Sequence, residues 1–352
     1  MTDLEAVPGV GPSVAKKLRQ ALVTTAELLA VQNPTDLREK TALGEGICEK
    51  VVRAARKEVG KFGFRSGLEI EQELASKPFL KTGLEQLDCT LMGGVEQGSI
   101  LELYGPARGG KTMWCSHLAV RVQLPIEQGG LEGRVLWLDT EKSFTPRTIR
   151  AIAHRFGLDP DIALGNISRA RVVLAAQIME LFETVPQMCA ENNYKLVIVD
   201  SLTSLFRAEY IGLDALKTRQ QEINGILNQM RRVAAATDAV FAYTNQVMAG
   251  IGGYVSIPNL PVGGHIISHA SDYRFYTRAK KGGVRVLELQ DNAGLPEFSM
   301  ELFVGWGGFF GSAEERAETE PEVKEFLEKN GYSTALPEPK TEATAEAEEE
   351  SE

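Results

Sequence analysis

The sequence predicts an α/β protein whose main domain is a doubly wound, mostly parallel sheet, with a small all-α domain in front of it. From Thr82 onward, short apolar runs typical of strands alternate with helical segments. A glycine-rich loop stands directly between the first apolar run and the helix after it. Before residue 60, by contrast, two glycine-rich turns are each followed by a helical segment. These patterns predict two domains of different fold class.

The N-terminal all-α domain is expected over residues 1–59. Its first turn is Pro8–Pro12, and we expect Ser13 to cap the helix that follows. A second turn at 44–46 opens a basic amphipathic helix that continues to Val59. Residues 60–82 mix glycines and aromatics with a charged helical stretch, which predicts a linker.

The α/β domain is expected over residues 83–312. Its predicted strands are Ile100–Tyr104, Val135–Asp139, Lys195–Asp200 and Ala239–Thr244. The third is continuously apolar, as in a strand buried on both faces. Three later segments are predicted to be antiparallel extensions of the sheet: Tyr273–Thr277, Arg285–Gln290 and Met300–Val304.

The remaining residues, 313–352, form an acidic tail. They carry 14 acidic and 4 basic residues, which accounts for the whole net charge of −10. We expect one acidic helix within 313–334. Residues 335–352 are rich in Pro, Ala and Glu, so they cannot bury enough apolar surface to offset the entropy of ordering, and they are predicted to be disordered.

Several classes of protein are excluded by composition. No run of 18 apolar residues exists, and the N-terminus lacks the pattern of a secretory signal. The four cysteines lie far apart, which favours a reducing compartment. We therefore expect a cytoplasmic protein with no membrane partner. His265 and His269 are four residues apart but have no evident third ligand, so no zinc site is expected.

The strongest motif is a phosphate-binding loop, which fits G-x-x-x-x-G-K-[ST]. It consists of Gly105, Pro106, Ala107, Arg108, Gly109, Gly110, Lys111 and Thr112, with Met113 next in the helix. Its backbone N–H groups can surround phosphate oxygens, and the helix N-terminus adds positive charge. We expect Lys111 to reach the β- and γ-phosphates and the Thr112 hydroxyl to bind Mg²⁺.

Three polar side chains at strand ends complete this predicted site. Asp200 ends a buried strand and is expected to lie near Mg²⁺, the alternative being a helix N-cap. Glu141 follows the neighbouring strand and could activate a water molecule, the alternative being a solvated glutamate at a helix start. Gln246 could sense the γ-phosphate, or be merely a polar strand end.

These motifs, in this order and spacing, resemble the RecA-type recombinases, and most closely the archaeal RadA branch and its eukaryotic strand-exchange relatives. The resemblance covers about residues 4–310. It includes Asp139–Glu141, Leu196–Ser201, Phe206–Gly212, Thr244–Val247 and Gly263–Ile267. It implies a RecA-like ATPase core with an N-terminal helix-hairpin-helix domain. It also implies ATP and Mg²⁺ as cofactors, single- and double-stranded DNA as partners, and self-assembly into a helical filament or ring.

The resemblance also assigns roles to residues. Glu141 and Lys111 would be catalytic, Thr112 and Asp200 would hold Mg²⁺, and Gln246 would link ATP to DNA. Asp291 would cap the nucleotide of the neighbouring protomer. DNA would be bound by a first loop at about Arg207–Arg219, by a second loop at about Met248–Pro261, and by the N-terminal domain. The individual DNA-binding residues would be Arg207, Arg219, Gly250, Gly252, Gly253, Gly9, Gly11 and Lys16, and the polymerisation residues Phe64 and Gly67.

The chain departs from the family pattern at several of these positions. The second loop contains no Lys or Arg, and Leu213 stands where the first loop usually has a basic residue. The polymerisation motif Phe-x-x-Ala is replaced by Phe64-Arg65-Ser66-Gly67. The arginine that stacks on adenine maps to Thr148, with Arg147 or Arg150 as possible substitutes.

Two functional hypotheses follow from the resemblance. The first is a nucleoid-associated, DNA-dependent ATPase that performs strand exchange in recombinational repair. The alternative is a RadA-like paralogue that binds and regulates another recombinase's filament, with weak or no strand exchange of its own. A ring helicase is disfavoured, because only the ATP motifs support it.

Overall fold

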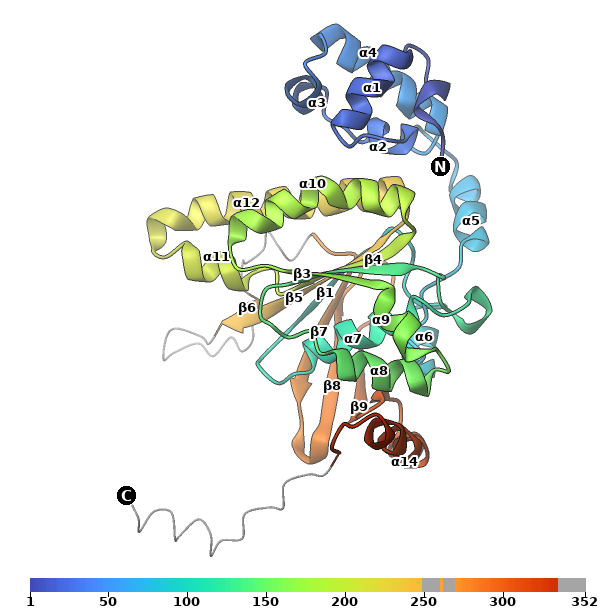
Figure 1. Cartoon of the computed structure of the whole chain (residues 1–352), viewed down its shortest axis with the longest axis vertical. Coiled ribbons are helices and arrows are strands. Elements are labelled where there is room, and N and C mark those ends of the chain that lie inside the picture. The colour runs from blue at the N-terminus through green and yellow to red at the C-terminus, as the bar shows by residue number, and fades with distance from the viewer. Residues whose placement is uncertain (249–259, 262–269, 335–352) are drawn as a thin grey trace, which may run out of the picture.

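A computed structural model describes residues 1–248, 260–261 and 270–334, and it shows the two predicted domains joined by a helical linker (Figure 1). The N-terminal domain is all-α, as predicted, and its helices enclose an apolar core that also includes Ala236 of the α/β domain. These helices are η1 (Leu4–Ala6), α1 (Pro12–Gln20), α2 (Ala26–Ala30), α3 (Pro34–Thr41) and α4 (Glu45–Val59).

The start of α1 differs from the prediction. The helix begins at Pro12, with Gly11 as its N-cap, so Ser13 lies inside the helix and is not the cap. Proline is well suited to the first helical position, because its ring fixes φ and the missing N–H would have no intrahelical partner there. Gly9, with φ 94°, makes the preceding turn.

The linker contains the expected charged helix, α5 (Gly67–Ser76), which is closed by a capping box between Ser66 and Glu69. Both ends of the linker are tied to the α/β domain at one point. The Nζ atoms of Lys61 and Lys77 lie 2.7 and 3.2 Å from Oδ1 of Asp238, which follows helix α12 (Leu213–Thr237).

The α/β domain is built on a ten-stranded sheet in the order β10-β9-β8-β7-β1-β5-β4-β2-β3, with β6 paired to β5. The strands from β7 to β3 along this order are parallel, and β8, β9 and β10 are antiparallel. The strands are β1 (Ile100–Gly105), β2 (Arg134–Asp139), β3 (Ile167–Arg171), β4 (Tyr194–Asp200), β5 (Val240–Met248), β6 (Leu260–Pro261), β7 (Tyr273–Ala279), β8 (Val284–Asp291), β9 (Phe298–Gly305) and β10 (Gly308–Phe310).

The predicted fold class is confirmed, with two differences in the strands. Tyr273–Thr277 was predicted to be antiparallel, but β7 runs parallel to β1, and the antiparallel part begins at β8. An apolar pattern records burial and not strand direction. Strand β3 was not predicted, because its edge position leaves Arg169 and Arg171 among only five residues.

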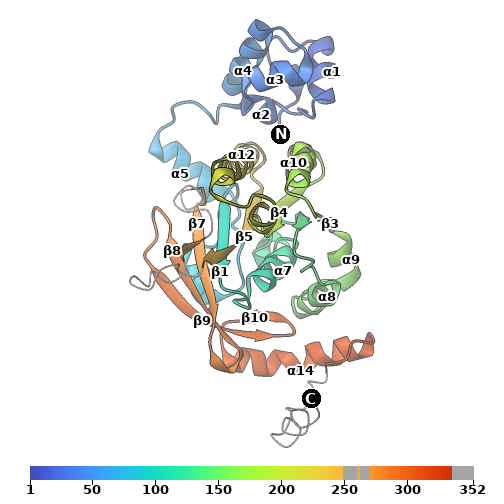
Figure 2. The same cartoon turned by 90° about the vertical axis from the view of Figure 1, so that its left-hand side faces the viewer.

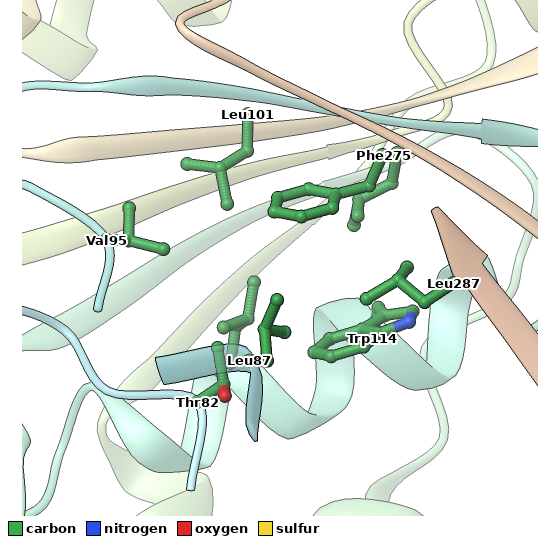
Figure 3. Close-up of a pocket in the computed structure, with 9 residues that line it drawn as sticks. Thr82, Leu87, Val95, Leu101, Trp114, Phe275 and Leu287 are labelled. Carbon is green, nitrogen blue, oxygen red and sulfur yellow. The ribbon is translucent and has the colours of Figure 1, made fainter. Parts of the chain in front are cut away.

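Helices cover both faces of the sheet (Figures 1 and 2). One face carries α6 (Glu85–Thr90), α7 (Lys111–Arg121), α8 (Pro146–Arg155) and α9 (Pro160–Gly165), and the other carries α10 (Ala175–Glu191), α11 (Ser204–Glu209) and α12. On the first face, Trp114 of α7 packs beside Leu287 and Phe275 around a small cavity of about 10 Å³ (Figure 3). Its apolar walls and small size make this cavity part of the core and not a ligand site.

The folded domain continues beyond the predicted boundary at residue 312. The expected acidic helix is α14 (Ala313–Lys329), and its buried residues Val323 and Leu327 pack with Ala151 of α8. A guanidinium nitrogen of Arg155 lies 2.6 Å from a carboxylate oxygen of Glu315. The apolar side of this helix is therefore part of the core. The predicted disorder of 335–352 lies outside the described residues.

No helix in the described ranges has both the length and the apolar character needed to cross a membrane.

Candidate nucleotide and DNA sites

The predicted nucleotide residues meet at one edge of the sheet. Strands β1, β4 and β5 are parallel neighbours, so their carboxyl ends reach the same edge, where Gly105 stands opposite Gln246. An open cavity of about 910 Å³ lies there. It is lined by all nine residues from Gly105 to Met113 together with Glu141, Asp200, Arg207, Gln246, Val247, Arg285 and Val304.

The glycines of the loop allow a close approach to strand β7. A Cβ atom added at Gly105 or Gly109 would lie 2.0 or 2.7 Å from the carbonyl oxygen of Thr277, so no side chain fits at either position. The Thr277 hydroxyl also donates a hydrogen bond to the carbonyl of Gly109 at 2.7 Å. Strand β7 thus packs against the loop and fixes its conformation. The motif alone did not reveal this contact.

Lys111 is folded back over the loop. Its Nζ donates hydrogen bonds to the carbonyl oxygens of Gly105 and Pro106, at 2.8 and 2.9 Å. Burial lowers the pKa of the ammonium group, while the nearby carboxylates of Glu141 and Asp200 act in the opposite direction. The ammonium group of Lys111 is thus a partly desolvated cation that lines the cavity.

Asp200 is buried at the end of β4 and accepts hydrogen bonds from three hydroxyl groups. Its Oδ2 accepts from Thr112 at 2.8 Å and Ser143 at 2.6 Å, and its Oδ1 accepts from Thr244 at 2.5 Å. Burial raises the pKa of this carboxyl, and the three hydroxyls oppose the shift. The alternative of a helix N-cap is wrong, because α11 begins only at Ser204. Adjacent hydroxyl and carboxylate oxygens are ligands that suit Mg²⁺.

A hydrogen-bonded row of side chains runs along the cavity from Glu141. Its Oε1 accepts from the Ser201 hydroxyl at 2.8 Å and from Nε2 of Gln246 at 3.0 Å. Oε1 of Gln246 in turn accepts from Arg207 at 3.1 Å. Glu141 is exposed, but it precedes α8 by several residues and is held by hydrogen bonds, so the alternative of a glutamate at a helix start is wrong. Gln246, near the end of β5, connects Glu141 with Arg207.

The other candidate residues lie away from this cavity. Asp291, at the far end of β8, lines a separate cavity and lies 3.9 Å from Arg274. Phe64 is fully exposed in the linker, and Gly67 is the first residue of α5. Gly9, Gly11 and Lys16 lie in the N-terminal domain, and Arg219 in α12. Gly250, Gly252 and Gly253 lie outside the described residues, as do His265 and His269.

Sequence reasoning missed several residues of the site. Ser143, Thr244 and Thr277 are single hydroxyl side chains with no motif around them, and only the fold brings them to Asp200 and the loop. Arg285 was assigned only to a strand. Neither proposed substitute for the adenine-stacking arginine lines the cavity, and Arg150 instead pairs with Asp161.

The fold and site together define the P-loop class of α/β domains, in which a strand, a glycine-rich loop and a helix hold a nucleotide at the edge of a parallel sheet. Residues 77–310 match the Rad51 family model, and residues 1–57 match the SAM-like helix-hairpin-helix tandem. The chain belongs to the Rad51 family. It is also 38% identical to the "DNA repair and recombination protein RadA" of Methanocorpusculum labreanum over 321 residues, which is 87% of this chain and 98% of that protein.

Proposed function

We propose that this chain is an ATP-dependent DNA recombinase, which binds single-stranded DNA as a filament and exchanges strands with homologous duplex in recombinational repair. The single observation that carries the proposal is the contact of Thr112 with Asp200 beside the Glu141–Gln246 pair, in a chain similar to RadA along nearly its full length.

The geometry supports a specific division of labour in ATP hydrolysis. The loop amides and Lys111 bind the phosphates, and Thr112 and Asp200 hold Mg²⁺. When bound, Mg²⁺ would act as a Lewis acid and stabilise the negative charge on the phosphate oxygens. Glu141 orients and accepts a proton from the attacking water, because it is the exposed carboxylate at the cavity while Asp200 is buried. Gln246 links this carboxylate to Arg207 and so connects hydrolysis with the DNA-binding segment that begins at Arg207 in α11.

DNA and neighbouring protomers would contact other surfaces. The first DNA loop begins at Arg207 and ends at Arg219 in α12, and the second loop covers the arginine-free segment 248–261. In the N-terminal domain, the turn of Gly9 and Gly11 exposes backbone amides for a phosphate, with Lys16 exposed nearby. Phe64, exposed on the linker, would insert into the next protomer of the filament, beside the small Gly67.

We assign these activities to four parts of the chain. Residues 1–59 would bind DNA, 60–82 would carry the polymerisation segment, and 83–312 would form the ATPase core. Residues 313–352 would be an acidic appendage, of which α14 is anchored to the core. We place the protein in the cytoplasm, on the nucleoid.

The alternative proposal is a paralogue that regulates another recombinase's filament. Two observations favour it: the second loop has no Lys or Arg, and glycine replaces alanine in the polymerisation motif. Each lost phosphate contact should weaken DNA binding and reduce its salt dependence.

A strand-exchange (D-loop) assay on the purified full-length chain, with ATP and Mg²⁺, separates the two proposals. Lys111→Ala is the control, because it removes the cation expected to bind the β- and γ-phosphates and should abolish hydrolysis and product. ATP-dependent product would support the recombinase. Hydrolysis without product would favour the paralogue, and near-normal turnover by Lys111→Ala would contradict the site itself.

A further inference from the structure

One basic side chain of the nucleotide cavity has no role in the scheme above. Arg285 lies on β8, where its backbone pairs with Ala279 of β7 and Leu302 of β9. Side chains alternate between the two faces of a strand, so Arg285 shares its face with Leu287 and Leu289. Leu287 packs beside Trp114 of α7 (Figure 3). Arg285 therefore lies at the edge of this apolar layer, near the N-terminus of α7, which the phosphate-binding loop precedes.

The side chain of Arg285 passes close to the start of α7 and lines the cavity. A Cβ atom placed on Gly110, the N-cap of α7, would lie 3.6 Å from Cγ of Arg285. The N-terminus of a helix carries a partial positive charge, and Lys111 adds a full one. Arg285 is therefore a further source of positive charge at this cavity.

The charge of Arg285 itself has no acidic partner among the described residues. Within the described ranges, no carboxylate lies at ion-pair distance from Arg285. In the part of the chain that the structure describes, Nη1 donates only to the carbonyl of the preceding residue, Val284, at 3.0 Å. The Nε atom is buried and has no hydrogen-bond partner among the described residues. A buried donor without a partner is costly, and an arginine in this state is suited to receive an anion.

Two other cations of the cavity, Lys111 and Arg207, differ from Arg285 in this respect, whereas Arg108 is exposed on the loop. Lys111 donates to two loop carbonyls and Arg207 donates to Gln246. Both also lie toward the strands that carry Glu141 and Gln246. In the sheet order, β8 lies two strands beyond β1, on the side away from β5 and β4. Arg285 thus flanks the cavity opposite the end where the γ-phosphate is expected.

We infer that Arg285 is a further nucleotide-binding residue, which contacts the α-phosphate of the bound nucleotide from the β8 side. This inference rests on the proposed function, because it takes the nucleotide to lie across the loop with its γ-phosphate near Glu141. A guanidinium offers several N–H donors in one plane and binds phosphate oxygens in a bidentate manner. The contact would be made equally to ATP and ADP, since both carry the α-phosphate.

The test is to measure Kd for ATP and for ADP by calorimetry on full-length Arg285→Gln and Arg285→Lys. Arg278→Gln is the matched control, because it removes the same charge from the neighbouring strand, where Arg278 is half-exposed and paired with Glu288. We expect Arg285→Gln to weaken ATP and ADP binding alike, by about tenfold. Arg285→Lys should lose less, the control should match the wild type, and KM for ATP should rise more than kcat falls.

Two results would overturn the inference: binding equal to that of the control, or a loss confined to ATP. Thermal unfolding of each variant shows whether the fold is retained. If Arg285→Gln fails to fold, the comparison of Arg285→Lys with the wild type decides. A wild-type chain that bound neither nucleotide would instead contradict the proposed function, so the two failures are distinguishable.

Discussion

At the scale of one residue, the buried carboxyl of Asp200 shows how a functional group can lower the stability of the fold. Its carboxyl is buried among three hydroxyl donors with a raised pKa. The stability that this raised pKa contributes is present below the pKa of the unfolded chain and is lost as pH rises through the folded pKa. At neutral pH, burial of the ionised carboxylate therefore works against folding of the metal-free chain.

We predict that Asp200→Asn raises the free energy of unfolding of the metal-free chain by about 1 kcal/mol at pH 7, because the amide removes a buried charge and retains hydrogen bonds to the hydroxyls. The same variant should lose Mg²⁺-dependent ATP hydrolysis. Urea unfolding without metal, together with an ATPase assay, checks both statements. A destabilised Asp200→Asn would show that the hydroxyls outweigh the burial of charge.

His117 gives a second pH dependence, unrelated to catalysis. It is fully buried in α7, and Nε2 lies 2.7 Å from the carbonyl oxygen of Thr82. Burial, with Arg155 nearby, lowers the pKa of the imidazole to about 3. Between the ordinary histidine pKa and this lowered value, the imidazole of His117 is protonated in the unfolded chain but neutral in the folded chain. The free energy of unfolding therefore falls as the solution is acidified through this range.

We predict that His117 alone makes the wild type about 2 kcal/mol less stable at pH 5 than at pH 7, from the 1.36 kcal/mol that each pKa unit represents. His117→Gln should lose this part of the acid sensitivity, whatever its stability at pH 7. Denaturant unfolding of both proteins at the two pH values measures the difference. Equal losses in wild type and variant would refute the assignment.

Among the elements, α14 shows how an acidic segment becomes part of a core. Val323 and Leu327 are buried against α8, and the ring of Phe326 stacks on His154 with centroids 4.2 Å apart. Arg155, which bonds Glu315, also lies over the ring of Phe310, 3.8 Å from its centroid. The helix thus covers the ends of α8 and β10, which support α7 and its loop.

Truncation after Ser312 should therefore lower the free energy of unfolding by about 3 kcal/mol, since fully burying one large aliphatic side chain is worth about 1.5–3 kcal/mol. Truncation after Thr334 is the matched control and should leave it unchanged, because 335–352 contain few apolar residues. It should also strengthen DNA binding at low salt, because an acidic segment competes for basic surface. Equal stability of the two truncated chains would show that α14 adds nothing to the core.

On the scale of the whole molecule, polar contacts join the N-terminal domain and linker to the core. Arg232 of α12 lies 3.7 Å from Asp36 of α3, and Asp238 receives Lys61 and Lys77 from the linker. Such half-exposed ion pairs contribute about 0–1 kcal/mol each and weaken with salt. These ion pairs by themselves therefore hold the orientation of the N-terminal domain only weakly.

We predict that the double variant Asp36→Asn/Asp238→Asn unfolds at nearly the same temperature as the wild type but has a larger radius of gyration by small-angle scattering. Asparagine suits the left-handed backbone of Asp238, whose φ is 56°, so the substitution tests charge and not backbone strain. Wild-type protein at high salt should resemble the variant at low salt. An unchanged radius under all conditions would mean that the apolar contact through Ala236 holds the domain in place.

Much of the fold and of the nucleotide site follows from local sequence chemistry. The alternation of apolar runs, the glycine-rich loop and the acids at strand ends predicted the parallel sheet and the loop, Glu141, Asp200 and Gln246 at one edge of it. This was possible because parallel strands deliver their carboxyl ends to one place, so position along a strand already implies position in space.

The other features of the fold and site depend on long-range contacts, because the local sequence around these residues does not indicate their partners. The direction of β7, the three hydroxyls around Asp200 and the packing of α14 each depend on a partner distant in sequence. Arg285 is the clearest case. In the sequence it is one charged residue of a strand, and only the pairing of β8 with β7 and β9 places its side chain, with the unpartnered Nε atom, beside the start of α7.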